Sequence, residues 1–195
     1  GKITIIDLSN GKSLLIHLKL SGQLVYHKDG QEFRGGHPIP FAGGASLPAK
    51  STHIIFGFSD GSRLFYNDVR QFGWIKVVGQ TDEQMSRELG KLGIEPLTPD
   101  FTLEKFSSIL QSSNRPIKLT LMDQEKIAGV GNIYANDALN LAKISPLRPA
   151  KSLSQSEKSK LRQAIIKALE GGLKYGGSTG ADEAFINVEG NPGRY

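Results

Sequence analysis

The sequence predicts an α+β protein in which an antiparallel β-sandwich or flattened barrel is followed by a helical domain. From Ile3 to Val78 the apolar residues come in short runs rich in Val, Ile and Phe, separated by turn residues, as strands require. After Thr81 the apolar residues take helical spacing, and residues typical of helix N-caps precede them. Because the two patterns occupy separate halves, we expect two domains, 1–95 and 96–195, joined by a linker around Pro96.

Turn residues divide the first half into strands. The pair Asn10-Gly11 tolerates the positive φ angles of a tight hairpin turn, and Ser59-Asp60-Gly61-Ser62 is a second hairpin signal. The predicted strands are 3–8, 13–18, 23–26, 53–58, 63–66 and 74–78. Between Asp29 and Pro48 the Gly and Pro content rises, which favours a long, poorly ordered loop.

Capping patterns mark two helices at the start of the second half. Thr81 and Gln84 fit a capping box, in which each side chain bonds the backbone amide of the other residue. Phe101 and Phe106 flank a Thr102 cap, as the two members of a hydrophobic staple do. We therefore expect helices from 81 to about 91 and from 102 to about 111.

A longer helix is expected near the end of the chain. Ser154 and Glu157 fit another capping box, and Gly171-Gly172 is expected to stop the helix that follows. One face of this helix is apolar, formed by Leu161, Ile165, Ile166 and Leu169.

Composition narrows the functional classes. The formal charge of +5 and the pI of about 9.4 favour an acidic partner, because clustered Lys and Arg displace the counterions around a polyphosphate. The chain has no cysteine and its four histidines are scattered, so we expect no metal site within it. It has neither an apolar run of membrane length nor a signal-peptide pattern. We therefore expect a cytoplasmic monomer that binds no membrane.

A glycine-framed turn in the second half carries the clearest chemical signal. Gly129 and Gly131 frame a connection that opens into a helix at Asn132, so bare backbone amides and a helix N-terminus would point outward. Such a turn can bind a phosphate, with Asn132 as a side-chain donor. We expect the following helix to pack inward through Ile133, Ala138 and Leu139. In the alternative interpretation, the two glycines only permit a sharp turn between helices.

This turn resembles the helix-two-turns-helix of the formamidopyrimidine-DNA glycosylase family, which includes the endonuclease VIII-like proteins. In that family Leu-Met-Asp-Gln and Gly-Val-Gly-Asn-Ile-Tyr-Ala recur together, as they do here at 121–124 and 129–135. Segments 17–22, 66–73 and 93–97 resemble three further family motifs in the same order. A small-subunit ribosomal protein and a topoisomerase subunit also contain a helix-two-turns-helix, but neither resemblance explains the strand half.

The resemblance implies a DNA-binding role for two loops of the first half. An enzyme that acts on a base inside a duplex must swing the nucleotide out, and side chains must fill the gap. The family inserts a Met, an Arg and a Phe, which correspond here to Leu20, Arg70 and Phe72. Arg70 would bond the orphaned partner base while Phe72 wedges between base steps. In the alternative interpretation, Leu20 and Phe72 are core residues and Arg70 is a surface ion-pair partner.

Other site residues follow from the same resemblance. Lys2 matches a family lysine that contacts phosphate and is implicated in β-elimination, and Lys118 matches a lysine near the lesion strand. Ser178 and Thr179 lie in a glycine-rich segment similar to the loop that closes over the extruded base.

The chain also departs from the family pattern. Ser51 stands where the family often has a DNA-contacting histidine, and Ser113-Asn114 replace a basic run. Some contact with the DNA backbone is therefore expected to shift to His53 and Arg115.

The family's nucleophile is the amine of an N-terminal proline, with a neighbouring glutamate as proton donor. Neither that opening nor the zinc finger expected after Tyr195 is in this sequence, so we expect a fragment that does not excise bases by itself. The implied cofactor of the whole protein is one zinc ion, held by that finger.

For the whole protein, the resemblance implies a DNA glycosylase and AP lyase of base-excision repair. It would remove oxidised purines such as 8-oxoguanine and formamidopyrimidines from double-stranded DNA, and would also bind abasic sites. Two alternatives remain open: a glycosylase for oxidised pyrimidines, and a noncatalytic paralogue that binds damaged DNA.

Overall fold

The computed structural model describes residues 2–36, 46–81, 83–177 and 193–195. These residues form two compact units. The strand unit contains 3–80 and the described residues from 174 onward, and the helical unit contains Lys2 and 81–173. The units thus divide between Gln80 and Thr81, earlier in the chain than the boundary at residue 96 that the sequence suggests.

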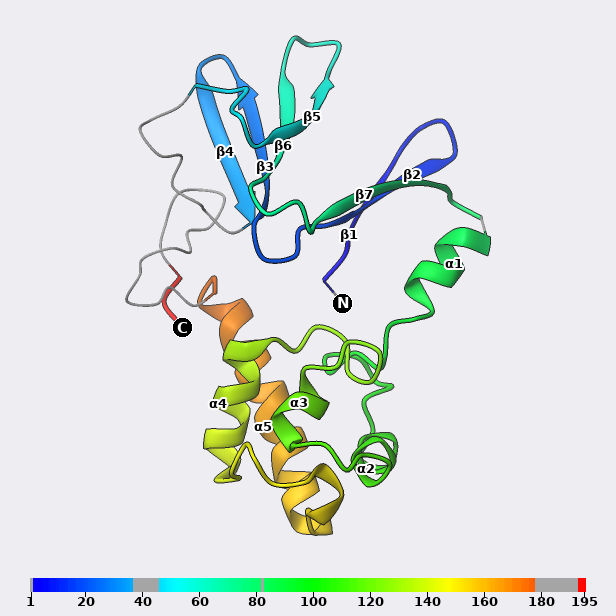
Figure 1. Ribbon diagram of the computed structural model, residues 1–195, viewed down its shortest axis with the longest axis vertical. Helices are drawn as coiled ribbons and strands as arrows, with labels where there is room; N and C mark the ends of the chain where they lie inside the picture. The colour runs from blue at the N-terminus through cyan, green and yellow to red at the C-terminus, as the bar shows by residue number, and fades with distance from the viewer. Residues whose placement is uncertain (1, 37–45, 82, 178–192) are drawn as a thin grey trace. The chain divides into compact units, whose positions relative to one another are not determined.

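Among the described residues, seven strands make up two antiparallel sheets (Figure 1), as the strand patterns predict. The strands are β1 (Thr4–Asp7), β2 (Lys12–His17), β3 (Gly22–Lys28), β4 (Gln31–Gly36), β5 (Thr52–Gly57), β6 (Arg63–Asp68) and β7 (Trp74–Gly79). Their order is β1-β2-β7 in one sheet and β4-β3-β6-β5 in the other. Both predicted hairpins form, with Gly11 and Gly61 at positive φ in their turns.

The expectation of a single long loop from Asp29 to Pro48 is wrong for its first part. Asp29 and Gly30 both have positive φ angles, which is the backbone geometry of a two-residue hairpin turn. This turn pairs β4 with β3 in unbroken register, from Lys28 opposite Gln31 to Gln23 opposite Gly36. Residues 37–45 of the expected loop lie outside the described part of the chain.

Two neighbouring chain crossovers connect the sheets. One runs from the end of β2 to the start of β3, and the other runs from the end of β6 to the start of β7. His17 pairs with Trp74 in the first sheet, and Gly22 pairs with Asp68 in the second. Since both ends of the two crossovers are paired, the crossovers lie side by side where the chain passes from one sheet to the other.

The helical unit contains five α-helices and one 3₁₀ helix among its described residues (Figure 1). They are α1 (Glu83–Leu89), α2 (Leu103–Gln111), α3 (Ile117–Leu121), α4 (Asn132–Ala142), η1 (Ala150–Ser152) and α5 (Gln155–Lys174). Their core contains Phe101, Phe106, Leu110, Ile117, Leu121, Ile127, Val130 and Leu161, all fully buried.

The predicted start of α2 is confirmed. The Thr102 hydroxyl accepts a hydrogen bond from the Lys105 amide at 3.2 Å, which satisfies one of the free donors of the first turn. The rings of Phe101 and Phe106 lie 5.2 Å apart and are fully buried, as a hydrophobic staple requires. For α1, residue 82 and the Gln84 side chain lie outside the described residues.

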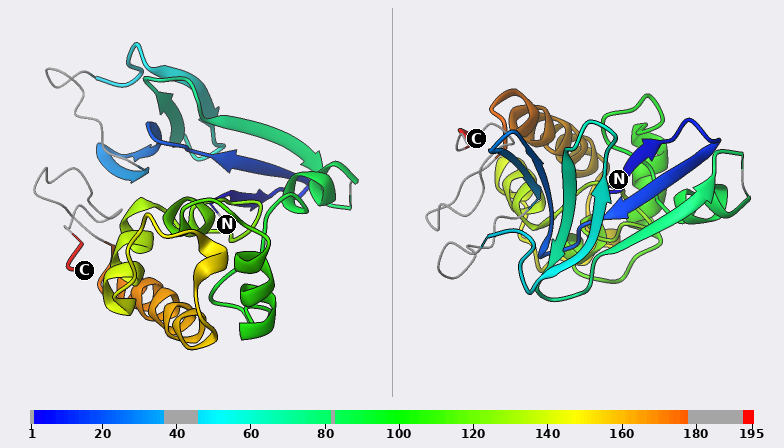
Figure 2. Two further views of the ribbon diagram at one scale, coloured as in Figure 1. Left: turned by 60° about the horizontal axis from the view of Figure 1, so that its bottom comes forward. Right: turned by 90° about the horizontal axis from the view of Figure 1, so that it is seen from above.

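The expected stop at Gly171-Gly172 is wrong, because α5 continues to Lys174. A glycine inside a helix costs only about 1 kcal/mol relative to alanine, so packing can offset it. Here α5 lies beside α4 (Figure 2), and Tyr134 packs against Gly172. A Cβ atom at Gly172 would lie 2.1 Å from the Tyr134 hydroxyl, so the close approach of the two helices depends on this glycine.

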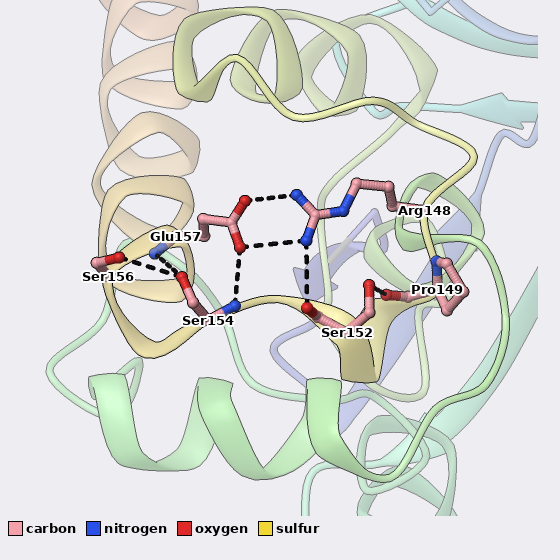
Figure 3. Close-up of polar contacts among 6 residues, drawn as sticks. All are labelled: Arg148, Pro149, Ser152, Ser154, Ser156 and Glu157. Atoms are coloured by element: carbon pink, nitrogen blue, oxygen red, sulfur yellow. Dashed lines mark hydrogen bonds and ion pairs between the residues drawn. The ribbon is translucent and has the colours of Figure 1, made fainter.

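The capping box of α5 is confirmed and gains a third member (Figure 3). The Ser154 amide donates to Glu157 Oε2 at 2.8 Å, and the Glu157 amide donates to Ser154 Oγ at 3.3 Å. The Arg148 guanidinium binds both oxygens of the same carboxylate and also donates to the Ser152 carbonyl at 3.2 Å. The hydrogen bond from Arg148 and those from Ser154 lower the pKa of Glu157 from 4.5 to about 2.

We expect Glu157→Gln to lower the thermal stability of the protein and to reduce its acid sensitivity. Because the folded-state pKa lies below the ordinary value, the ionised side chain stabilises the fold fully above pH 4.5, and this contribution is lost as the pH falls toward about 2. Thermal unfolding followed at pH 7 and between pH 4.5 and 2 measures both effects. Glu170→Gln, an exposed change in the same helix, is the control. Equal acid sensitivity in wild type and Glu157→Gln would contradict the assignment.

Candidate nucleic-acid interface

The two crossovers of the strand unit expose apolar and planar side chains to solvent. Leu20 in the first crossover is 65% exposed, and Phe72 in the second is 58% exposed. The Arg70 guanidinium lies 5.0 Å from the centre of the Phe72 ring, within the range of a cation–π contact. The alternative in which Leu20 and Phe72 are core residues is therefore wrong. The two side chains are available to enter a partner molecule.

The buried carboxylate of Asp68 accepts hydrogen bonds from both crossovers. It accepts a hydrogen bond from the Ser21 hydroxyl of the first crossover. It also accepts bonds from two amides of the second crossover, Gly73 at 2.7 Å and Arg70 at 3.2 Å. Burial by itself would raise the pKa of Asp68, but the bonds from Ser21 and from the backbone amides lower it below its ordinary value. The carboxylate therefore stays ionised at neutral pH and remains an acceptor.

The second crossover bends tightly around this carboxylate. Gln71 has a φ of 56°, in the left-handed region. At Gly73 a Cβ atom would lie 2.2 Å from the Tyr66 hydroxyl and 3.0 Å from Asp68 Oδ2, so only glycine fits without displacing them. Burial and the neighbouring Asp68 charge raise the pKa of Tyr66 to about 12. Tyr66, Asp68 and Gly73 are thus required by the shape of the loop that presents Arg70 and Phe72.

The structural role of Asp68 was not predicted from the sequence. A single acidic residue at the end of a strand is usually solvated, and its partner Ser21 is distant in sequence. The available signal was the resemblance of segment 66–73 to a family motif, which includes Asp68 together with Arg70 and Phe72.

In the helical unit, the glycine-framed turn is held by the Gln124 side chain. Its Oε1 accepts from the Gly129 amide at 2.9 Å, and its Nε2 donates to the Val130 carbonyl at 2.7 Å and to the Met122 carbonyl at 2.9 Å. Gly129 has a φ of +88°, which most other residues adopt only with strain. The turn therefore has a fixed shape, and Gln124 is a second positioning residue that sequence reasoning missed.

The end of this turn has the features of an anion site. Gly131 is the N-cap of α4 and has no side chain that could cap the amides of the first turn. Asn132 in that turn is exposed. A Cβ atom at Gly131 would lie 2.9 Å from Lys2 Nζ, so this ammonium group lies directly beside the turn. A helix N-terminus and a lysine both attract negative charge. Lys2, which was predicted separately from the turn, lies here beside Gly131 and Asn132.

The expectation that Ile133 packs inward is wrong. The buried face of α4 is formed by Ala135, Ala138, Leu139 and Ala142. Ile133 precedes Ala135 by two positions, which places it off that face, and it is 49% exposed. Ala138 and Leu139 are buried as predicted.

Lys118 and the residues that depart from the family pattern lie in different surroundings. Lys118 is part of α3 and is half-buried. Ser113 is buried and its hydroxyl bonds that of Thr120 at 2.9 Å, so it supports the helical core. Arg115 is exposed and pairs with Asp123 at 3.1 Å.

Ser51 and His53 support the base of the second crossover. The Asp68 amide donates to the Ser51 carbonyl at 2.9 Å. Nε2 of His53 lies 2.8 Å from the Asp68 carbonyl oxygen, a hydrogen bond in which the imidazole is the donor. The expectation that His53 takes over DNA contact stays a prediction.

Three further expectations can be placed against the described residues. Ser178 and Thr179 lie outside them. Within them, no group of three or more His, Cys, Asp and Glu side chains is arranged to hold a metal ion. The zinc implied by the resemblance stays a prediction. No helix among the described residues is both long and apolar enough to cross a membrane.

Exposed apolar and planar side chains on the strand unit, and a helix N-terminus beside a lysine in the helical unit, are features typical of the class of nucleic-acid-binding proteins. Two family models identify it further. The one described as the formamidopyrimidine-DNA glycosylase N-terminal domain matches residues 1–75, and the one described as the H2TH domain of the same glycosylase matches residues 92–183.

Curated relatives named formamidopyrimidine-DNA glycosylase match the whole chain. The relative from Pelotomaculum thermopropionicum is 38% identical and 64% of its length is covered. The relative from Moorella thermoacetica is 34% identical and 69% of its length is covered. The chain therefore belongs to the formamidopyrimidine-DNA glycosylase family. It spans slightly less than two thirds of the Pelotomaculum relative.

Solved structures agree with this assignment. The MutM (Fpg) protein from Thermus thermophilus matches with a TM-score of 0.80 and 34% identity, over all of this chain and 65% of that one. The Lactococcus lactis Fpg in complex with abasic-site DNA matches with a TM-score of 0.77 and 30% identity, again over all of this chain and 65% of that one.

We expect Gln124→Ala to destabilise the glycine-framed turn. The change leaves the Gly129 amide and the Val130 carbonyl without their partner, which costs about 1–3 kcal/mol. Amide hydrogen exchange should accelerate at residues 129–132 more than in the core of α5. Gln163→Ala, an exposed change on α5, is the matched control. Unchanged exchange at the turn would show that Gln124 does not hold it.

Proposed function

We propose that the protein that carries this chain is a base-excision repair DNA glycosylase with AP lyase activity, acting on oxidised purines. The observation that carries the proposal is the exposure of Leu20 and of the Arg70–Phe72 pair on two anchored crossovers. Large apolar side chains that a buried network holds in solvent are unfavourably hydrated, and they lose this cost when they are buried in a partner.

The chemistry of these side chains fits a duplex from which a nucleotide has been extruded. Unstacking a base step costs a few kcal/mol, and an apolar or planar group that fills the gap recovers part of this cost. Leu20 and Phe72 have that character. The five donors of Arg70 suit the acceptors of an unpaired base edge.

The helical unit would bind the DNA backbone. Lys2, the amides at the start of α4 and the exposed Asn132 form a donor-rich, positively charged site, as a phosphate requires. By resemblance, Lys2 would also assist β-elimination. Among the relatives, the Lactococcus lactis Fpg has been solved with DNA that contains an abasic site and with DNA that contains Fapy-dG.

Excision by the protein as its gene encodes it tests the reaction and the substrate class. We expect cleavage of duplexes with 8-oxoguanine or formamidopyrimidine to be faster than cleavage of duplexes with an oxidised pyrimidine. Single-turnover rates on matched duplexes measure the preference. The reverse ranking would support the oxidised-pyrimidine alternative. Binding to damaged DNA with no excision of either lesion would support the noncatalytic one.

Two substitutions separate the proposed binding roles. Arg70→Ala should lower the preference for an abasic-site duplex over an intact duplex by about tenfold, because each good bond to a base edge contributes about 1–3 kcal/mol. Asn132→Ala should weaken binding to both duplexes by a similar factor, because phosphate contacts are independent of sequence and damage. Fluorescence anisotropy with both duplexes at two salt concentrations measures these effects. Small and equal effects of the two variants would contradict the assigned roles.

A further inference from the structure

The two crossovers that present the exposed side chains are joined by a buried polar pair, Ser21 and Asp68. Ser21 belongs to the first crossover and is 3% exposed, while Asp68 begins the second and is 1% exposed. The Ser21 hydroxyl donates to the Asp68 carboxylate. The same Ser21 oxygen accepts a hydrogen bond from the Arg70 amide at 3.3 Å. The hydroxyl of the first crossover therefore contacts both Asp68 and Arg70 of the second.

The position of this pair follows from the sheet register. Asp68 lies opposite Gly22, the residue that follows Ser21, so the ends of β3 and β6 bring the two side chains together. Leu20 precedes Ser21 and Arg70 follows Asp68 by two residues. A movement of either crossover relative to the other would break a hydrogen bond to a buried carboxylate, and such bonds contribute more than bonds between neutral groups.

We propose that Ser21 and Asp68 are positioning residues that make Leu20 and the Arg70–Phe72 pair enter DNA as one unit. This inference rests on the proposed function, because it assumes that these side chains enter the duplex. Two independently mobile loops would each lose conformational freedom on binding, whereas two loops fixed to one carboxylate lose less. The preference for damaged DNA would therefore depend on residues that do not reach the DNA.

A double-mutant cycle measures the coupling. Leu20→Ala and Arg70→Ala are made singly and together in the protein as its gene encodes it. For each variant, the affinity for a duplex with a tetrahydrofuran abasic analogue is compared with the affinity for an intact duplex. We expect the effects in the wild-type background to be non-additive by about threefold or more. In a Ser21→Ala background the same two changes should become additive.

Ser13→Ala is the matched control. Ser13 is also buried in the strand unit and also donates to an aspartate carboxylate, that of Asp7, but it lies in the β1–β2 hairpin. This variant should lose stability in thermal unfolding yet leave the non-additivity of Leu20→Ala and Arg70→Ala intact. Loss of coupling in Ser13→Ala as well would overturn the inference, because general destabilisation would then explain the result.

Asp68→Asn gives a second readout that does not depend on DNA. The amide keeps the shape of the side chain but places an N–H group against donors, so amide exchange should accelerate at Arg70 and Gly73 together with the first crossover. Acceleration confined to the second crossover, or coupling that persists in Ser21→Ala, overturns the inference. If neither Leu20→Ala nor Arg70→Ala changes the preference in any background, the proposed function itself fails, and this inference fails with it.

Discussion

The buried carboxylate of Asp68 is the interaction on which the strand unit's surface depends. Removing a charge from water costs several kcal/mol unless donors replace the lost solvent, and here the Ser21 hydroxyl and backbone amides of the second crossover replace it. Those donors come from the segments that expose Leu20, Arg70 and Phe72. The requirement to satisfy one buried charge therefore fixes the shape of both crossovers.

In the helical unit, an uncharged side chain holds a loop by hydrogen bonds in a similar way. The Gln124 amide offers one acceptor and two donor hydrogens, and it bonds the Gly129 amide and the Val130 carbonyl of the glycine-framed turn. The backbone that would face phosphate is thus fixed by a side chain behind it. In both units a polar side chain beneath the surface, Asp68 or Gln124, holds the loop in one shape. The exposed residues of that loop are then available to contact a partner.

Strands and helix starts were largely predictable because their signals are local. The hairpin at Gly11 and the cap at Thr102 depend on neighbours within a few residues, and both formed as expected. The Asp29-Gly30 pair is also typical of a hairpin turn. It was assigned to a long loop because many glycines and prolines follow it. The end of α5 was not predictable locally, since it depends on Tyr134 packing against Gly172. Asp68 was missed for the same reason, because its partner Ser21 is distant in sequence.

The contact between Gly172 and Tyr134 has a consequence for divergence within the family. A Cβ atom at position 172 would overlap the Tyr134 phenol group where it now stands, so a larger residue at 172 requires that ring to turn away or to be lost. The two positions should therefore tend to change together. Where the tyrosine keeps its present orientation, glycine at 172 lets the rest of α5 diverge without changing the spacing between the two helices.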